Sequence, residues 1–397
     1  MIEGHDTMTD AFFASDETLS DADGFDAACL RATIDLGALR DNWLTMRRLS
    51  GSARTAAVVK ANAYGLGIEA VAETLYAAGA RDFFVANAEE GAELRPFAPD
   101  ARIFVLAGLW PGIESVFLDY GLVPVINSEE QLAFFMGLLA EHGEYPCALH
   151  VDTGMNRLGL SLPEALALAD DPSRPASFSP VLVMSHLACA DTPDHPLNGR
   201  QLDAFRQVSK AFEGVDASLA NSAGVHLGTE YHFDLTRPGI ATYGGQAVNG
   251  VANTMAPVVT AEARILQVRE ARAGETASYG AAAMLTRDSR IAIVGAGYSD
   301  GYHRGGSGAG VPLRQSLPKG AQGFLRGCRV PQLGRITMDL TLFDVTDVPG
   351  AKAGDYIELF GPNLSITEAA AAAGTIDYEL LTSLGHRYDR LYLDPED

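Results

Sequence analysis

The stretch AAVVKANAYGLG, residues 56–67, places Lys60 directly after a short apolar run and then sets a tyrosine among small residues. A buried strand hides apolar side chains from water, whereas an ammonium group prefers to stay solvated. Lys60 could lie in a loop with its amine in solvent. Alternatively, the strand carries the amine into a pocket at its carboxyl end, where a lysine can form a Schiff base. The remainder of the sequence distinguishes these two interpretations.

Further apolar runs of this kind follow along the chain, most of them before a helical stretch. The eight candidate strands are AAVV (56–59), DFFVA (82–86), RIFVLA (102–107), VPVI (123–126), CALHV (147–151), PVLVM (180–184), ASLA (217–220) and FDLT (233–236). Short apolar runs that alternate with helices predict βα units and a parallel sheet. Eight such units within about 220 residues favour an α/β fold of the (β/α)8 TIM-like barrel type over an open, doubly wound sheet.

Paired polar residues mark where several helices of this region should begin. A capping side chain accepts a hydrogen bond from an unpaired backbone amide, and a glutamate or glutamine three positions later reaches back. The pairs with this spacing are Asn87 and Glu90, Ser128 and Gln131, Ser161 and Glu164, and Asn198 and Gln201. Helix ends are expected at Gly79, Gly143 and Gly214, because glycine readily adopts the left-handed conformation that terminates a helix.

From about Met255 onward the sequence changes to β-branched and alternating stretches separated by glycine and proline. The clearest are VVTAEARILQV (258–268), SRIAIVGAGY (289–298), RITMDLTLFDV (335–345) and DYIELF (355–360). Such segments predict a second, mainly β domain. We therefore expect an acidic, flexible tail over residues 1–28, a barrel over residues 29–255 and the β domain over residues 256–397.

The net charge of −22 argues against nucleic acid or an anionic membrane as the main partner, since both attract positive surfaces. No apolar run reaches the roughly 20 residues of a membrane span. Residues 1–28 contain no lysine or arginine to begin a signal peptide. The four cysteines form no CxxC pair and the nine histidines no HExxH motif, so neither a disulfide framework nor a metal site is indicated. These features favour a cytoplasmic protein with reduced thiols.

Polar residues follow several predicted strands at the point where each strand ends, which is the face of a barrel that carries chemistry. These residues are Lys60 and Tyr64 after the first strand, Arg157 after the fifth, His186 after the sixth, Ser222 after the seventh and Arg237 after the eighth. Taken singly, each has a structural explanation, such as an ion pair, a core histidine or a helix cap. Their common position at strand ends favours one shared site.

The last two of these loops, NSAG (221–224) and RPGI (237–240), are suited to binding a phosphate group. Small residues allow close backbone approach, and Ser222 offers a hydroxyl. A proline presets a turn at the amides of Gly239 and Ile240. A phosphate beside a strand-end lysine points to pyridoxal phosphate, whose aldehyde condenses with an amine.

Eight motifs in this chain resemble those of the alanine racemase family, whose members are fold type III pyridoxal phosphate enzymes. They are VVKANAYGLG (58–67), VDTGMNRLGL (151–160), SHLACAD (185–191), NSAG (221–224), RPGIATYG (237–244), ASYGAA (277–282), GYSDGY (297–302) and GRITMD (334–339). The resemblance covers roughly residues 30–390. Eight motifs in the family's order are far more specific than any one of them.

The resemblance implies a barrel followed by a β domain, in a head-to-tail homodimer whose active sites are shared between the subunits. The implied reaction interconverts L-alanine and D-alanine by two-base proton transfer on a pyridoxal phosphate aldimine, and it supplies D-alanine for peptidoglycan in bacteria. Lys60 would hold the cofactor and act on one face of the amino acid, while Tyr279 from the other subunit would act on the opposite face. Racemisation needs this placement, because the proton leaves one face and another returns to the other.

The resemblance also implies roles for the other motif residues. Arg237 would face the pyridine nitrogen and, because it stays cationic, would oppose protonation of the ring. Arg157 and the Met338 amide would lie near the substrate carboxylate, and His186 would lie beside the ring. The residues implied to bind phosphate are Tyr64, Ser222, Gly239 and Ile240, and those implied to line the entrance are Asp191, Tyr298 and Arg335.

Two positions depart from the family's pattern. Many members carry a lysine, modified by carbon dioxide, that steadies the arginine of the DTGMNR motif, whereas this chain has His150 there. Another ligand, such as an anion or a neighbouring side chain, would then have to hold Arg157. Some members also have a phosphate-binding tyrosine near the C-terminus that narrows the pocket, where this chain offers Gly385, with Tyr388 as a candidate substitute. A wider pocket would admit serine or larger side chains.

Three other functions fit parts of this pattern. A broader-specificity amino-acid racemase would share every motif quoted above. An amino-acid decarboxylase on the same barrel would be expected to pair the ring nitrogen with an acidic residue, whereas Arg237 is basic. A non-catalytic pyridoxal phosphate carrier typically ends with the barrel, whereas this chain continues with a second domain that includes Tyr279.

Overall fold

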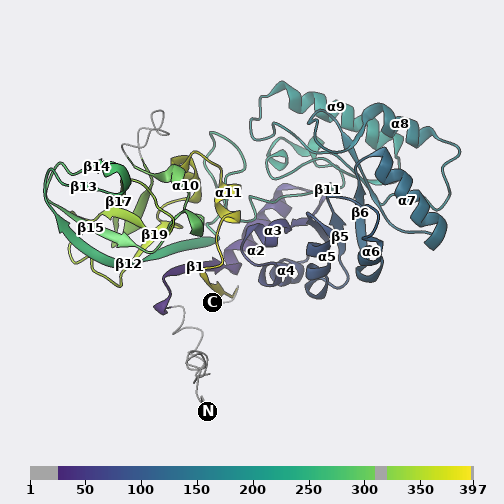
Figure 1. The fold of residues 1–397 in the computed structure, drawn as a ribbon. Helices are drawn as coiled ribbons and strands as arrows, with labels where there is room; N and C mark the ends of the chain where they lie inside the picture. Colours follow the sequence, from purple (N-terminus) through teal and green to yellow (C-terminus); the bar gives the residue numbers. More distant parts are fainter. Residues whose placement is uncertain (1–25, 309–319, 395–397) are drawn as a thin grey trace, which may run out of the picture.

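Parallel strands form from the short apolar runs, because both faces of such strands are buried between an inner core and outer helices. The computed structural model describes residues 26–308 and 320–394. Within them one sheet joins, in spatial order, β3 (Ala57–Val58), β4 (Asp82–Val85), β5 (Arg102–Val105), β6 (Leu122–Ile126), β7 (Ala148–Asp152), β9 (Leu182–Met184) and β10 (Asp216–Ser218), while β8 (Leu160–Ser161) pairs with β7. Neighbouring strands are parallel throughout. Figure 1 shows this lobe at the right of the molecule.

The sheet closes on itself through the last predicted strand. β11 (Leu235–Thr236) pairs in parallel with β2 (Arg54–Thr55), which leads into β3. On the other side of β11, the amide of Asp234 donates to the carbonyl of Ala217 in β10 at 3.0 Å. All eight predicted strands are therefore present, and they form a closed (β/α)8 barrel rather than an open, doubly wound sheet.

Helices lie outside the barrel and follow most of its strands, as predicted. Their bounds are α2 (Leu36–Leu49), α4 (Ile68–Ala77), α5 (Ala88–Leu94), α6 (Glu114–Tyr120), α7 (Glu129–His142), α8 (Leu162–Asp170) and α9 (Pro196–Ala211). Gly79, Gly143 and Gly214 all have positive φ at or just past helix ends, which confirms their prediction as terminators.

The predicted capping side chain is confirmed at three of the four helices. Of the predicted pairs, the full reciprocal box is found for Ser161 and Glu164, whereas Glu90 and Gln131 accept from the amides of Ala86 and Asn127 instead. The capping side chains found as predicted are those of Asn87 on α5, Ser128 on α7 and Ser161 on α8. The fourth prediction is wrong: α9 begins at Pro196, which suits a first helical turn, and His195 is its cap. Asn198 and Gln201 lie buried within the helix, where their side-chain amides donate to carbonyls of the preceding loop. Those loop carbonyls compete successfully for the two side chains.

Alternating side chains of the strands point into the barrel and out toward the helices. Inside, Phe84 and Phe104 stack with ring centroids 4.7 Å apart, and both are fully buried. Their neighbours Phe83 and Ile103 belong to the larger cluster between strands and helices. Burial on both faces explains why these strands are continuous apolar runs in the sequence.

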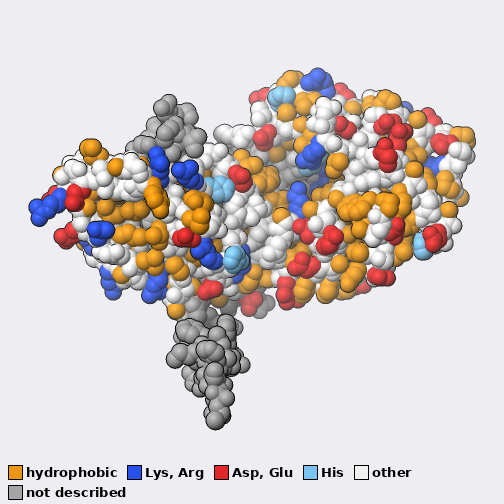
Figure 2. Space-filling model, viewed as in Figure 1, with side chains coloured by type: hydrophobic (Ala, Val, Ile, Leu, Met, Phe, Trp, Pro, Cys, Tyr) orange, Lys and Arg blue, Asp and Glu red, His pale blue; other side chains and the backbone are white. Residues whose placement is uncertain are grey.

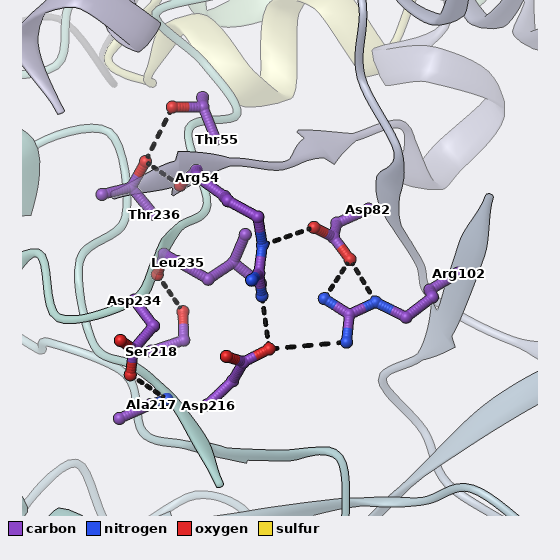
Figure 3. Close-up of polar contacts among 10 residues, drawn as sticks. All are labelled: Arg54, Thr55, Asp82, Arg102, Asp216, Ala217, Ser218, Asp234, Leu235 and Thr236. Atoms are coloured by element: carbon purple, nitrogen blue, oxygen red, sulfur yellow. Dashed lines mark hydrogen bonds and ion pairs between the residues drawn. The ribbon is translucent and has the colours of Figure 1, made fainter. Parts of the chain in front are cut away.

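Charged side chains close the amino-terminal end of the barrel, and each comes from the first residue of a strand (Figure 3). Asp82 accepts from Arg102 at 2.6 Å and lies 3.4 Å from Arg54. Asp216 contacts both arginines as well. Asp82 is almost fully buried, so the two guanidinium groups provide the partners that a buried carboxylate needs. This network lies at the opposite end of the barrel from the predicted site.

The second lobe, at the left of Figure 1, is mainly antiparallel β structure, as predicted. Within the described residues, a ring of strands runs in the order β12 (Val259–Ala271), β15 (Ser289–Val294), β18 (Thr341–Asp344), β17 (Cys328–Leu333), β16 (Gln322–Leu325) and β19 (Tyr356–Phe360), which pairs again with β12. The lobe also contains β13 (Thr276–Ala277), β14 (Ala283–Met284), α10 (Ile366–Ala373) and α11 (Asp377–Thr382).

Two strands from opposite ends of the chain extend this β sheet. β1 (Leu30–Asp35) pairs with β12 in antiparallel fashion and with β20 (Asp389–Leu393) in parallel. Residues 30–35, expected within the barrel range, thus belong to the β sheet, and the chain passes from them into α2 of the barrel.

An acidic segment was predicted over residues 1–28, and residues 1–25 of it lie outside the described part of the chain. Across residues 26–308 and 320–394, no helix combines the length and the apolar character that crossing a membrane requires. The four cysteines, all in this part of the chain, are free thiols.

Candidate active site

A cavity of about 540 Å³ opens where the barrel strands end. The eight barrel residues predicted to bind cofactor or substrate all line it, namely Lys60, Tyr64, Arg157, His186, Ser222, Arg237, Gly239 and Ile240. Figure 2 shows Lys or Arg side chains within a hollow of this lobe. The structure therefore places Lys60 in a pocket rather than in a solvent-exposed loop.

Lys60 begins a turn with an uncommon backbone conformation. The four residues that follow it in α3 (Lys60–Tyr64) all have φ between 51° and 57°, although none of them is glycine. Left-handed conformation costs on the order of 1–2 kcal/mol per residue, so surrounding contacts must hold the turn. Glu90 accepts from the Ala61 amide at 2.7 Å, and the Asn62 side chain accepts from the first amide of α4 at 2.7 Å. These contacts fix where the lysine and the tyrosine of the turn lie.

The Lys60 amine is half-buried and has no hydrogen-bond or ion-pair partner among the described residues. Burial lowers its pKa, and the positive charge of Arg157 lowers it further, while Glu90 partly opposes this shift. A lysine with a lowered pKa has a larger share of neutral amine at pH 7. The neutral amine is the form that attacks a carbonyl and the form that accepts a proton.

A buried cation faces the same cavity. Arg237 follows β11, and its guanidinium donates to the Ser218 hydroxyl and, at 2.5 Å, to the Ser185 carbonyl. It also lies 5.8 Å from the centre of the Phe84 ring. Burial lowers the pKa of Arg237 to about 9, which leaves the group cationic at pH 7. A fixed positive charge without a carboxylate partner in the described residues therefore lies in the cavity wall.

The loops after β10 and β11 present hydrogen-bonding groups suited to an anion. Ser222 Oγ accepts from the amides of Gly239 and Ala241, at 2.8 and 3.3 Å. The buried amide of Ile240 and the hydroxyl of Tyr64 have no partner among the described residues. A Cβ atom on Gly239 would lie 2.3 Å from the Tyr64 hydroxyl, so glycine is required there. These unpaired donors fit a phosphate, and together with the strand-end lysine they fit pyridoxal phosphate.

Two histidines on neighbouring strands and their loops are neutral; His150 is buried and His186 is partly buried. Burial lowers the pKa of His150 to about 4, helped by the positive charge of Arg237. The same two causes lower the pKa of His186 well below its usual value. Asn221 Nδ2 lies 3.4 Å from His186 Nε2, while the Asn221 oxygen already accepts from a backbone amide, so this ring nitrogen is an acceptor. Neither imidazole adds positive charge beside Lys60.

Sequence reasoning missed Tyr378, which closes one side of the cavity. It comes from α11 (Asp377–Thr382) of the β lobe, and its ring centroid lies 6.1 Å from that of Tyr64. Burial raises the pKa of Tyr378 to about 12, and the charges of Asp191 and Asp377 add to this shift. The phenol therefore stays protonated at pH 7. Asp191, predicted at the entrance, lies near this tyrosine.

The suggestion that Gly385 leaves the pocket open, with Tyr388 as a substitute, is wrong. Tyr388 is buried away from the cavity, and Gly385 packs near the backbone of Asp300. The tyrosine at the pocket stands earlier, in TIDYELL (375–381). The aspartate before it, Asp377, fixes this segment against the barrel, because its carboxylate accepts from the backbone amide of Gln246 at 2.6 Å. No local pattern reveals such a contact between distant segments.

The remaining predicted residues, Tyr279, Tyr298, Arg335 and Met338, lie on loops of the β lobe and outside this cavity. Ser278 Oγ donates to the Arg335 carbonyl at 2.9 Å and accepts from the Arg335 amide at 3.0 Å. The loop after Tyr298 is hydrogen-bonded to the Met338 carbonyl. Tyr279 is 72% exposed and Met338 is 55% exposed. The structure thus brings these residues close to one another but not to Lys60 of the same chain.

Two family models match the chain in sequence. Residues 34–247 match the model described as alanine racemase, N-terminal domain, and residues 258–392 match the model described as alanine racemase, C-terminal domain. Together they cover most of the barrel and of the β lobe.

Individual proteins match over nearly the full chain. The chain is 67% identical over 371 residues to the alanine racemase of Rhizobium meliloti (strain 1021), covering 93% of this chain and 98% of that protein. It is 62% identical over 395 residues to the biosynthetic alanine racemase of Agrobacterium fabrum, covering 98% and 100%. A crystal structure of alanine racemase from Bartonella henselae with covalently bound pyridoxal phosphate matches with a TM-score of 0.85 at 36% identity, covering 92% of this chain and 100% of that one. On this evidence the chain belongs to the alanine racemase family.

Proposed function

We propose that this protein is a pyridoxal phosphate-dependent racemase that interconverts L-alanine and D-alanine. The observation that carries the proposal is Lys60, whose amine ends a barrel strand, lacks a partner among the described residues and shares one cavity with the cation of Arg237. A lysine kept partly neutral in a pocket is suited to covalent attachment of an aldehyde. The relatives described above, each named as an alanine racemase, support the same activity.

The cavity residues fit the cofactor in three places. Lys60 would bind its aldehyde, and the amide of Ile240 with the hydroxyls of Tyr64 and Ser222 would bind its phosphate. When bound, pyridoxal phosphate withdraws electrons from the α-carbon of an amino acid and so makes the α-proton removable. Arg237 would face the ring nitrogen, where its permanent charge opposes the arrival of another proton and limits side reactions such as transamination.

Two groups on opposite faces of the α-carbon would move the proton. Lys60, with its lowered pKa, accepts a proton from one face as a neutral amine and returns it as an ammonium group. Tyr279 of the partner subunit serves the other face. Its phenol donates a proton when Lys60 has removed one, and its phenolate accepts a proton when the reaction runs the other way. The stereochemistry is inverted because removal and return take place on different faces.

Other residues would bind the substrate's carboxylate and limit the size of its side chain. Arg157 lines the cavity, and its guanidinium has no partner among the described residues, which suits a carboxylate; the Met338 amide of the partner subunit would contact the same group. Tyr378 closes one side of the cavity, which favours alanine over amino acids with larger side chains. This residue distinguishes the proposal from a broader-specificity racemase.

A homodimer would complete each site. Tyr279, Tyr298 and Met338 form an exposed cluster with large apolar surfaces, and Leu158 at the rim of the cavity is 47% exposed. Figure 2 shows hydrophobic side chains gathered over the β lobe. Exposed apolar patches of this kind mark interaction surfaces. A head-to-tail pair related by twofold symmetry would place the β-lobe cluster of each subunit over the other's cavity.

The biological role that fits this reaction is supply of D-alanine for peptidoglycan in the cytoplasm. The relative from Agrobacterium fabrum at 62% identity is named as biosynthetic, which supports this direction over catabolism. The strongly negative net charge fits a protein whose partners are small molecules and its own second copy rather than nucleic acid.

The proposal is tested by proton NMR of L-alanine in heavy water with the cofactor-loaded protein, followed by chiral separation of the recovered alanine. Loss of the α-proton signal together with D-alanine is the expected result. A yellow protein that neither exchanges the proton nor forms D-alanine would sink the proposal and favour a non-catalytic carrier. Equal turnover of serine and alanine would favour the broader racemase.

A further inference from the structure

The turn of α3 that carries Lys60 is held from outside the cavity by the last strand of the chain, β20. Tyr392 of β20 donates from its hydroxyl to the Leu66 carbonyl at 2.8 Å. Burial raises the pKa of Tyr392, so the phenol is protonated at pH 7 and able to donate. A Cβ atom on Gly67 would lie 2.2 Å from the same hydroxyl, which shows how closely the strand approaches the segment after the turn.

The guanidinium of Arg390 makes further contacts from the same face of β20. It lies two positions before the tyrosine, so both side chains leave the strand on one side. Its Nη2 atom donates to the carbonyls of Gly65 and Leu384, at 3.1 and 3.2 Å. Its Nη1 atom donates to the carbonyls of Gly385 and Tyr388, at 3.5 and 3.3 Å. One side chain thereby joins the end of the lysine turn to the loop after α11.

The two segments joined in this way both supply walls of the cavity. α11 carries Tyr378 and packs against α3, as Figure 1 shows. A Cβ atom on Gly65 would lie 2.7 Å from the Leu381 carbonyl of α11, so only glycine allows this approach. Arg390 therefore fixes the lysine turn and the tyrosine helix relative to each other.

The turn needs such support because its backbone is strained. Residues 61–64 have φ between 51° and 57°, and Gly65 follows with a φ of 83°. A run of left-handed residues persists only where the surroundings fix it. Inside the barrel, Glu90 and the Asn62 side chain hold the amides at Ala61 and at the start of α4. The two β20 side chains hold the carbonyls at the other end of the same turn.

We propose that Arg390 and Tyr392 are positioning residues, which hold the end of the turn after Lys60 and so place its amine at the α-carbon of the substrate. The inference rests on the proposed function, because that function gives Lys60 the proton transfer on one face. In the proposed dimer the β lobe would then serve two sites, its own subunit's through β20 and the partner's through its exposed loops.

The test uses two conservative variants and two matched controls. Arg390→Lys keeps the charge but loses the planar fork of donors, and Tyr392→Phe removes only the hydroxyl. The controls, Arg95→Lys and Tyr145→Phe, lose similar bonds to carbonyls near the amino-terminal ends of strands, away from the cavity. Their acceptors are the carbonyls of Ala98, Pro99, Ala101, Tyr120 and Gly121 for the arginine, and of Phe117 and Leu122 for the tyrosine.

The first measurement is hydrogen exchange of the cofactor-loaded enzymes, followed by mass spectrometry of the peptide that contains residues 61–67. The amides of residues 65–67 donate to carbonyls within the turn, so their exchange reports its opening. We expect this peptide to exchange about tenfold faster in Arg390→Lys and Tyr392→Phe, and at the parent rate in both controls. Parent-like exchange in both β20 variants would overturn the inference.

The second measurement separates positioning of Lys60 from a general loss of structure. Ordinary and α-deuterated forms of L-alanine and D-alanine are compared as substrates, with melting temperatures as the control for folding. In the proposed function Lys60 removes the α-proton of one enantiomer, and Tyr279 of the partner subunit removes that of the other. A displaced Lys60 slows its own step, so kcat should fall about tenfold and the isotope effect on kcat/KM should rise for one enantiomer only.

Isotope effects that rise for both enantiomers, or for neither, would overturn the inference, because a general structural role does not distinguish the two faces. Failure of the proposed function is a separate observation. It would appear in the parent enzyme, which would then leave the α-proton of alanine unexchanged in heavy water, whereas the hydrogen-exchange comparison would still report whether β20 holds the turn.

Discussion

The hydroxyl of Tyr64 lies against the backbone of Gly239, so closely that a Cβ atom there would be 2.3 Å from the phenolic oxygen. The tyrosine cannot easily move aside, because its ring stacks on Tyr243 with centroids 4.4 Å apart and follows the left-handed turn after Lys60. The first barrel loop and the last one therefore meet at the cavity in a fixed arrangement. The phosphate donors proposed for the cofactor depend on this contact.

Gly239→Ala should weaken cofactor binding about tenfold. The added methyl group displaces the Tyr64 hydroxyl and overfills the space between the first and last barrel loops, where the phosphate is proposed to bind. Binding is measured by titrating cofactor-free protein with pyridoxal phosphate and following absorbance. Gly199→Ala is the matched control, since a Cβ on this helical glycine meets nothing within 4 Å. Parent-like affinity in Gly239→Ala would mean that the phosphate binds elsewhere.

Tyr378→Ala should broaden the choice of substrate, because this ring closes one side of the cavity. We expect kcat/KM for serine relative to alanine to rise about tenfold, the range in which pocket size discriminates small side chains. Tyr378→Phe keeps the ring and should leave the ratio unchanged. If the Ala variant keeps the parent's preference, another part of the site sets substrate size.

Asp82→Asn should destabilise the barrel without affecting its chemistry, since the network in Figure 3 lies at the opposite end from Lys60. A nearly buried carboxylate with two guanidinium partners is removed, and we expect a loss of about 2 kcal/mol in the free energy of unfolding. Urea titration of the cofactor-loaded enzyme measures it. Asp203→Asn breaks an exposed pair with Arg206 and should change stability by less than about 0.5 kcal/mol. Similar values for both variants would contradict the importance of the network.

His150 should make the enzyme less stable in acid. Burial first, and then Arg237, lower its pKa to about 4, so between that value and the usual 6.5 the unfolded chain binds a proton that the folded protein does not. Stability is therefore full above about pH 6.5 and falls toward pH 4, by at most about 3 kcal/mol from this group. Melting temperatures from pH 7 to pH 4.5 should fall more steeply for the parent than for His150→Gln. Parallel curves would contradict the prediction.

The sequence predicted the barrel well because its information there is local. Each strand is a short apolar run, and parallel topology places every strand's carboxyl end at one mouth, so Lys60, Arg157 and Arg237 could be grouped before any coordinates were known. The predictions that failed concern contacts between distant segments. Tyr378 reaches the cavity from a helix of the other lobe, and Asn198 gives up a capping role to satisfy loop carbonyls. Neither contact has a local pattern.

The shared active site is tested most directly with purified heterodimers of differently tagged chains. One pairs Lys60→Ala with Tyr279→Phe, and the other pairs the parent with the double variant. If each site takes its lysine from one subunit and its tyrosine from the other, the first heterodimer keeps one intact site and racemises alanine at about half the parent rate, while the second is inactive. The reverse outcome, an inactive first heterodimer and a half-active second, would place both groups within one subunit and contradict the account.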